Sequence, residues 1–407
     1  MGGIRRSTSV NRYVPVSMIV DVGEAWTPPN PYSLAGPKDW RPPLSRVIFH
    51  ETIHYWQYIG HTHLIRLVEE DWGRLRHFDK TREILPPGAL RRGFSQRKPE
   101  IGFSTQDLVE AHARFWDVQA LGPPLLIELE LDAPNRDVGE ILTRAQYERL
   151  KAEGKIWHHY DQDGQGVGYS SLSFDLAMRL AAGRYALPYL ELLEKTNDLI
   201  AAALFPLCVH FALHSREPAD FYLALVARLA GQVGLERGRA IEQAWRALYV
   251  DVWREAELLH CELYGCEFFT GQAEIHESLL YQEHPGYRMA HTMLALACDH
   301  IQNNRPQQFL VGPAEMPAAM RALWTLDYLL GCCGMTVSRS PDLLAFTAPP
   351  VIRFAEGRSW KIGEIFDQLP YQSSAPCTVA QPPPRAGLAQ ALLEVDEKWN
   401  EMLLAGL

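Results

Sequence analysis

The sequence lacks the features that would direct it into a membrane or onto nucleic acid. Its longest apolar run, Leu199–Leu213, has 15 residues and contains Pro206 and His210, whereas a membrane-spanning helix needs roughly 20 apolar residues. We therefore expect a buried core helix at this run and no membrane partner. The net charge of −10 leaves no excess of Lys and Arg for neutralising phosphates, so we also expect no nucleic-acid partner.

Motifs that define several other protein classes are missing as well. None of the seven cysteines forms a C-x-x-C pair, so their spacing does not predict a cysteine zinc site. Arg5 and Arg6 near the start are not followed by an apolar segment of signal-peptide length. Together with the odd cysteine count, this favours reduced thiols and a cytoplasmic protein. The sequence contains no P-loop, Rossmann fingerprint or nucleophile elbow.

Hydrophobic periodicity predicts a mainly α fold with little β structure. The expected elements are a strand over residues 13–22, a long helix from about Arg46 to about Phe78, a helix from Thr105 to about Leu121, an almost wholly helical stretch over residues 172–330, a short strand at Val351–Phe354 and a final helix from about Leu388 to Leu404. We divide the chain into a metal-binding catalytic region (1–125), a helical domain (126–372) and a Pro-rich linker with a C-terminal helix (373–407).

The most informative stretch is His50-Glu51-Thr52-Ile53-His54, an H-E-x-x-H motif. On a helix, residues four apart lie on one face, about one turn of ~5.4 Å along the axis, so His50 and His54 can bind one metal ion. Glu51 is placed to reach a water molecule on that ion. A metal-dependent hydrolase is therefore the leading hypothesis.

A zinc site of this type needs a third protein ligand, and three residues are candidates. On a continuous helix His61 lies roughly 10 Å beyond His54, too far to share one ion. It is also one position late for the metzincin pattern H-E-x-x-H-x-x-G-x-x-H, which we exclude. Glu110 and His112 are two residues apart on the later helix and so point to different faces. We favour Glu110, because Ala113 one turn later would let two helices approach closely.

This combination of motifs resembles a known family. His50-Glu51-x-x-His54 followed by Glu110-x-x-Ala113 resembles the gluzincin branch of the H-E-x-x-H zinc metallopeptidases. The resemblance covers about residues 46–120 and implies a zincin-like metal-binding helix pair with little β structure, followed by a large helical body. It further implies that His50, His54 and Glu110 bind Zn²⁺ and that Glu51 is the general base.

Further details extend the resemblance and limit it. The segment ending at Gln57 is similar to the H-E-x-x-H-x-x-Q stretch of poorly characterised bacterial members. In many gluzincins an Asp follows the ligand glutamate by four residues and orients a histidine ligand, but here Arg114 stands at that position. Asp107, Asp117 or a backbone carbonyl would have to orient the histidine instead. Zincin folds also place a sheet beside the metal helix, whereas only one convincing strand precedes the motif.

The resemblance also implies a mechanism and a substrate class. A bound zinc ion would lower the pKa of its water toward ~7 and polarise the scissile carbonyl, and Glu51 would move the proton from the water to the leaving amine. The substrate would be a peptide, a protein or a small amide. His158, His159 and Tyr160 are candidates for stabilising the oxyanion, and Gln57 shares the metal-binding face of the helix.

Two other classes of function remain open. A helical-bundle iron oxygenase, with one or two iron ions, would use Glu-x-x-His pairs from two helices, and Glu51-x-x-His54 and Glu257-x-x-His260 have this spacing. A catalytically silent binding protein could keep the zincin helix as structure. A further polar segment indicates either a second metal site, a substrate pocket or, as we favour, a polar helix surface. It comprises Glu274, His276, Glu277, Glu283, His284, His291, Asp299 and His300. The sequence does not define an oligomeric state.

Overall fold

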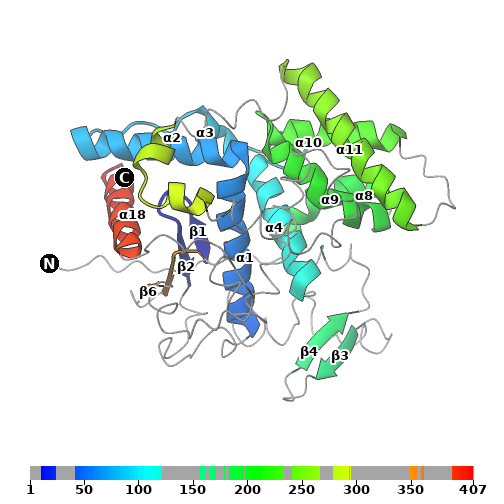
Figure 1. The fold of residues 1–407 in the computed structure, drawn as a ribbon, viewed down its shortest axis with the longest axis horizontal. Helices are drawn as coiled ribbons and strands as arrows, with labels where there is room; N and C mark the ends of the chain where they lie inside the picture. Colours follow the sequence, from blue (N-terminus) through cyan, green and yellow to red (C-terminus); the bar gives the residue numbers. More distant parts are fainter. Residues whose placement is uncertain are drawn as a thin grey trace. The chain divides into compact units, whose positions relative to one another are not determined.

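A computed structural model of the chain describes residues 11–23, 42–121, 156–160, 166–170, 178, 183–196, 198–232, 241–265, 278–292, 294, 349–354, 359–361 and 387–406. The described residues are mainly helical with a few short strands, so the expected mainly α fold is confirmed (Figure 1). Among these residues, none of the helices combines the length and the apolar character required to cross a membrane.

The chain divides into two compact units that do not follow the linear order of the sequence. The first unit consists of Met1–Arg92, Gly271–Asn304 and Cys332–Leu407, and the second of Gly93–Thr270 and Arg305–Gly331. Segments from both ends of the chain therefore build one unit. These boundaries differ from the three consecutive regions expected from the sequence.

The first unit contains a small four-stranded sheet in the order β1-β2-β5-β6. The strands are β1 (Arg12–Val14), β2 (Ile19–Val22), β5 (Val351–Phe354) and β6 (Ser359–Lys361). The central pair β2 and β5 is parallel, and both outer pairs are antiparallel. The expectation of one strand over residues 13–22 is wrong, because the chain turns at Pro15, which has no N–H for a strand ladder. The strand expected at Val351–Phe354 is confirmed.

The long helix expected from Arg46 to Phe78 is two helices, α1 (Pro42–Gly60) and α2 (Thr62–Thr81). The break falls at His61, whose backbone is extended with φ −107° and ψ 125°. Gly60 precedes it and is a poor helix former. The two helices run in clearly different directions (Figure 1), so the premise of a continuous helix through His61 is wrong.

Helix α18 (Leu388–Ala405), expected at the C-terminus, is confirmed and packs on α2 and β2. Leu392, Val395, Trp399 and Met402 form its buried side. The short helices α3 (Ala89–Phe94) and α13 (Leu279–Glu283) also have residues in this unit. Helix α13 also packs on α2.

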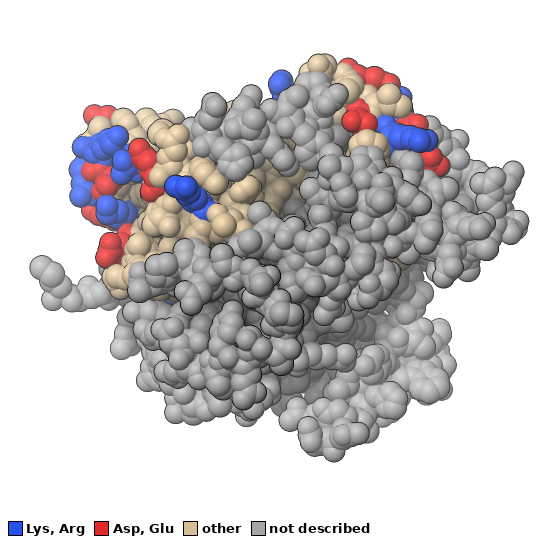
Figure 2. Space-filling view, viewed as in Figure 1, with Lys and Arg blue, Asp and Glu red and all other residues tan. Residues whose placement is uncertain are grey.

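Opposite charges connect α18 to the sheet and to α2. Arg353 of β5 donates to Asp21 of β2 at 2.7 Å and to Asp396 of α18 at 2.6 Å, and both carboxylates are buried. At the surface, Lys398 pairs with Asp79 at 3.1 Å. Figure 2 shows the described charged residues of both signs interleaved over this part of the first unit.

Helix α9 (Asp198–Leu213) is the centre of the second unit, and its burial confirms the core helix expected from the apolar run. It contacts α4 (Thr105–Leu121), α8 (Leu187–Lys195), α10 (Pro218–Gln232) and α11 (Ile241–Tyr264). The ring of Phe205 on α9 lies 5.4 Å from Phe115 of α4, 5.4 Å from Tyr189 of α8 and 6.1 Å from Tyr222 of α10, centroid to centroid. The helix expected from Thr105 is confirmed.

The second unit also contains a hairpin of β3 (Ile156–Tyr160) and β4 (Gly166–Ser170), and a short 3₁₀ helix, η4 (Gly183–Ala186). His158, His159 and Tyr160, which we expected on a loop, belong to β3. Their side chains lie outside the described part of the structure, so their proposed role at an oxyanion stays a prediction.

Candidate metal centre

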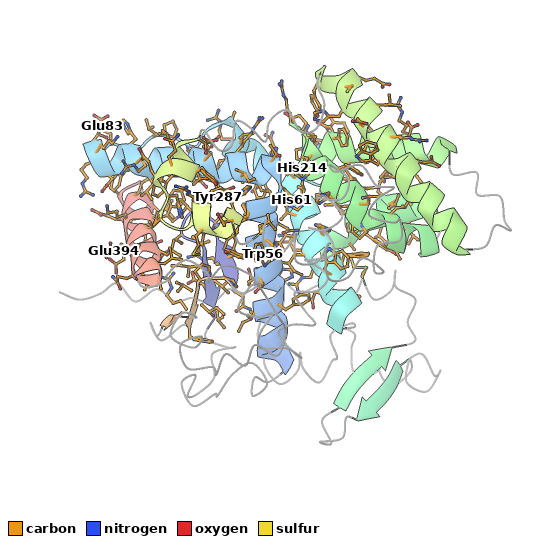
Figure 3. The ribbon with its side chains drawn as sticks, viewed as in Figure 1. Trp56, His61, Glu83, His214, Tyr287 and Glu394 are labelled. Atoms are coloured by element: carbon orange, nitrogen blue, oxygen red, sulfur yellow. The ribbon has the colours of Figure 1, made fainter. Side chains whose placement is uncertain are left out.

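Helix α1 is buried around its whole circumference from Ile48 to Ile59. Apolar residues are expected on such a helix, but five polar ones are buried there too. They are His50, Glu51, Thr52, His54 and Gln57. Because a buried polar group costs free energy unless it forms a hydrogen bond or binds an ion, this polar group within a buried helix marks a candidate functional site. Trp56, on the same turns of α1, is fully buried (Figure 3).

The two motif histidines face each other across one turn of α1. Their Nε2 atoms lie 3.2 Å apart, and their rings meet edge to face with centroids 4.7 Å apart. The side-chain oxygen Oε1 of Gln57 accepts a hydrogen bond from Nδ1 of His54 at 2.8 Å. The proton of a neutral His54 is thereby held on Nδ1, and its Nε2 carries a lone pair directed toward His50.

This geometry fits a tetrahedral metal ion. Two imidazole nitrogens bound to one zinc ion at ~2.0–2.1 Å lie about 3.3–3.4 Å apart in a tetrahedral arrangement, close to the 3.2 Å between Nε2 of His50 and Nε2 of His54. Histidines that bind metals usually donate their other ring N–H to a carbonyl or carboxylate oxygen. Gln57 provides that acceptor to His54, which is the supporting position we expected for it.

Glu110 lies on α4, whose start is fixed by a local cap. The Ser104 hydroxyl accepts the backbone N–H of Asp107, and Asp107 Oδ2 accepts the backbone N–H of Ser104. This reciprocal arrangement is a capping box, with Ser104 rather than Thr105 as the capping residue. Glu110, in the following turn, is half-buried. His50 and His54 belong to the first unit and Glu110 to the second, so the role of Glu110 as the third ligand stays a prediction.

The other residues of α4 that we considered are committed to local contacts. The indole N–H of Trp116 donates to Nε2 of His112 at 3.2 Å, which supports Glu110 over His112 as the ligand. Asp107 accepts two hydrogen bonds from Arg97 at 3.1 Å each. These bonds, together with those from Ser104, outweigh the effect of burial and lower the pKa of the Asp107 carboxyl. Asp107 therefore caps α4. The residue that accepts the Nδ1 proton of His54, and so orients this histidine, is Gln57.

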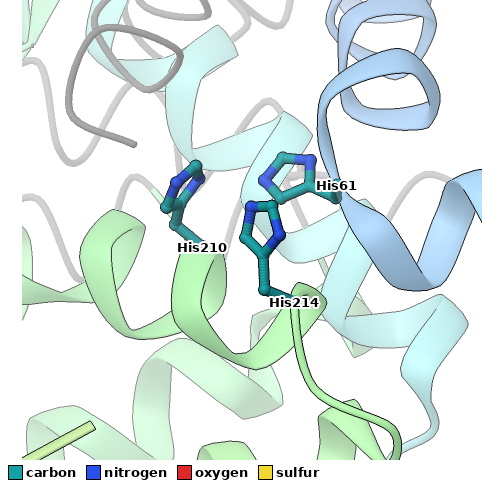
Figure 4. A group of neighbouring side chains, drawn as sticks. All are labelled: His61, His210 and His214. Carbon is teal, nitrogen blue, oxygen red and sulfur yellow. The ribbon is translucent and has the colours of Figure 1, made fainter. Parts of the chain in front are cut away.

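A further pair of histidines was not found from the sequence. It consists of His210 and His214 in the second unit, both buried. His210 lies in the last turn of α9, and His214, four residues later, directly follows this helix (Figure 4). Burial, and after it the proximity of His260, lowers the pKa of His214 to about 3, so its ring is neutral at neutral pH. The signal that could have identified this pair is an H-x-x-x-H spacing at the end of the apolar run.

The Glu-x-x-His pair that an iron oxygenase would use lies on α11. Glu257 is half-buried and His260 is buried. The ring of His260 lies 4.8 Å from the Tyr264 ring and 6.0 Å from the Phe221 ring, between centroids. The described contacts of His260 are thus aromatic.

In the polar segment 274–300, the described residues play structural roles. Nε2 of His284 donates to the carbonyl of Val16 at 2.8 Å, and its Nδ1 accepts the backbone N–H of Tyr287 at 3.0 Å. Both ring nitrogens of His284 are thus used, and neither is left for a metal. Glu283 pairs with Arg76 at 2.9 Å, and His291 packs against a tyrosine ring. Glu274, His276, Glu277, Asp299 and His300 lie outside the described residues.

No family model, curated protein or solved structure matches this chain. The chemistry of the centre is therefore argued from its residues. Two facing imidazoles suit Zn²⁺ and also Fe²⁺. A carboxylate, Glu51, lies next to the first imidazole in the sequence and is buried with it.

Proposed function

We propose that this chain is a zinc-dependent hydrolase of the H-E-x-x-H type that cleaves amide bonds in peptides, proteins or small amides. The observation that carries the proposal is the pair of facing Nε2 atoms of His50 and His54, 3.2 Å apart, with Gln57 holding the proton on the opposite nitrogen of His54. Glu110 on α4 is the proposed third ligand, as the resemblance implies. Two histidines and one carboxylate would leave one position of a tetrahedral ion for water.

The residues then have separate tasks. A zinc ion held by these residues would lower the pKa of its water toward ~7 and polarise a carbonyl oxygen. Glu51 would accept the proton of the attacking water and deliver it to the leaving amine. His50 and His54 hold the ion on α1, and Gln57 fixes the orientation of the His54 ring. The burial of Glu51 keeps bulk water from competing for its carboxylate.

Metal content tests the ligand assignment. The full-length chain would be stripped with a chelator, reloaded with Zn²⁺ and analysed for zinc per chain. We expect His54→Ala and Glu110→Ala each to lose one ion, because a zinc site loses most of its affinity without one of three protein ligands. The matched control Glu394→Gln changes an exposed helix glutamate on α18 and should leave the zinc content unchanged. Full zinc in Glu110→Ala would reject this residue as a ligand.

Turnover tests the role of Glu51. Glu51→Gln preserves the size of the side chain and removes its basicity, so we expect normal zinc content and a loss of amide cleavage of about 100-fold or more. The assay is cleavage of a mixed library of quenched fluorescent peptides and N-acyl amides by the full-length protein. Unchanged cleavage by Glu51→Gln would show that Glu51 is not the base. Zinc binding without cleavage of any of these compounds by the wild-type chain would favour a silent binding protein.

An iron-dependent oxygenase is the second candidate, because two histidines and one carboxylate also form the ligand set of mononuclear iron oxygenases. Anaerobic reloading with equal Zn²⁺ and Fe²⁺ separates the two functions. Hydrolysis that depends on Zn²⁺ supports our proposal. Consumption of oxygen by the Fe²⁺-loaded chain, without hydrolysis by the Zn²⁺-loaded chain, would replace it.

A further inference from the structure

We propose that the first unit carries a self-association surface through which two copies of this chain form a two-fold dimer. The centre of this surface is an apolar patch of four exposed aliphatic side chains, Ile84, Leu85, Leu403 and Leu404. None of these residues belongs to the candidate metal centre, so the proposal does not depend on the proposed function.

The first argument is the number of large aliphatic side chains exposed at this place. Ile84 and Leu85, which follow the end of α2, are 38% and 39% exposed, and Leu403 and Leu404, in the last turn of α18, are 43% and 45% exposed. They are four of the eight large hydrophobic residues that are exposed in the described part of the chain. Single exposed leucines are ordinary on a protein surface, whereas a group of them with charged residues around it is typical of an interaction site.

The second argument is that the two pairs of residues form one patch. Arg82 ends α2 with a φ of 62°, in the left-handed region, so the chain leaves the helix before Ile84. Arg82 also pairs with Glu401 of α18 at 3.1 Å. A Cβ atom on Gly406 would lie 3.7 Å from Cδ1 of Ile84, so this side chain reaches the end of α18. The apolar residues after α2 therefore lie beside those at the end of α18, which packs on α2 (Figure 1).

The third argument is the separation of charge around the patch. Glu394 and Glu397 lie on the exposed face of α18. Lys80 lies at the end of α2, and the guanidinium of Arg92 on α3 donates to the carbonyl of Pro87, close to the first pair of aliphatic residues. All four charged side chains are exposed, and none of them forms an ion pair with another described residue. Each copy thus presents two anions on α18 and two cations on α2 and α3.

A second copy of this chain is the occupant that these charges favour. In a two-fold interface the same surface of both copies meets, so the two glutamates of one copy can face the two cations of the other, and the aliphatic patches bury each other. Complementary charges of this kind determine the register of an interface. An anionic lipid surface would attract a patch rimmed by Lys and Arg alone, but the glutamates of α18 would repel it.

Sedimentation equilibrium of the full-length chain at a series of concentrations tests the proposal. We expect the wild-type chain to show a monomer–dimer equilibrium, and Ile84→Lys and Leu404→Lys each to weaken the dimer by about 10-fold or more, because the new charge would lie between the two apolar patches. These side chains are exposed, so the variants should melt at the wild-type temperature. The matched control is Leu258→Lys, which adds the same charge at an exposed leucine of α11 in the second unit, and it should dimerise normally.

Charge reversal tests the two-fold arrangement itself. The double variant Glu394→Lys with Glu397→Lys and the double variant Lys80→Glu with Arg92→Glu should each dimerise more weakly than the wild-type chain, and an equal mixture of the two should form a heterodimer as stable as the wild-type dimer. A wild-type chain that stays monomeric would overturn the proposal, and so would a dimer that Ile84→Lys and Leu404→Lys do not weaken. A monomer that binds phosphatidylserine vesicles, and loses this binding in Leu404→Lys, would replace the second copy with a lipid surface.

Discussion

Gln57 provides the most direct test of the metal centre, because it would affect a bound ion only through its hydrogen bond to His54. Its side chain is fully buried, and Oε1 accepts the proton of His54 Nδ1 at 2.8 Å. Gln57→Met keeps the volume and the helix and removes this acceptor. Gln57→Glu keeps an oxygen acceptor and adds a negative charge, which makes the His54 ring more basic.

The size of the effect follows from this single contact. Loss of an outer hydrogen bond to a metal-bound histidine typically weakens metal binding 10–100-fold, which is about 1.4–2.7 kcal/mol. We expect Gln57→Met to weaken zinc binding at His50 and His54 by this amount, and Gln57→Glu to bind zinc at least as tightly as the wild-type chain. The carbonyl of Gln57 remains in both variants, so the contact to His61 persists, and the end of α1 should be unchanged.

Competition with a chromophoric zinc chelator measures these affinities in the full-length protein, with thermal melts as a check on folding. The exposed substitution Gln390→Met on α18 is the control and should not change the zinc affinity. Equal zinc affinity in Gln57→Met and wild type would refute the role of Gln57. A weaker affinity accompanied by a large fall in melting temperature would point to a general disturbance of α1 and not to the orientation of His54.

Two further predictions concern the stability of the first unit. Burial lowers the pKa of His284 to about 4, below its value of about 6.5 in an unfolded chain, so only the unfolded chain binds this proton as the pH falls below about 6.5. His284 should contribute about 2 kcal/mol to the drop in the free energy of unfolding from pH 7 to pH 5, so urea unfolding should show a smaller drop in His284→Gln; equal drops would refute the assignment. Arg353→Met leaves two buried carboxylates without this cation and should cost about 3–5 kcal/mol in the same assay. Adding Asp396→Asn should restore more stability than adding Asp21→Asn, because Asp21 keeps its pair with Arg12 at 3.2 Å; the reverse order would contradict this argument.

The sequence predicted well the elements that local patterns determine. The helix beginning at Thr105, the core helix in the apolar run and the C-terminal helix all have the expected positions, because each has a continuous helical pattern with a clear start or end. The facing of His50 and His54 also followed from their spacing alone. Four residues on a helix bring two side chains to one face whatever surrounds them.

What the sequence did not predict depends on backbone direction or on contacts between distant segments. The apolar pattern continues through Gly60 and His61, so periodicity gave no sign that α1 ends there. The parallel pairing of β2 with β5 joins segments more than 300 residues apart, and no local pattern identifies such a partner. The division into two units is equally non-local, since the first unit includes segments from three parts of the chain.

The end of α1 explains how Gln57 contacts two histidines. In a continuous helix the Gln57 carbonyl would accept only the backbone N–H four residues later, and His61 does donate that bond at 3.0 Å. Because the backbone of His61 is extended, its ring turns back and Nδ1 reaches the same carbonyl, also at 3.0 Å. The Gln57 side chain meanwhile holds His54, one turn earlier. Gln57 thus holds two histidines, His54 with its side chain and His61 with its carbonyl. Only the second contact, which depends on the helix break at His61, required the structure.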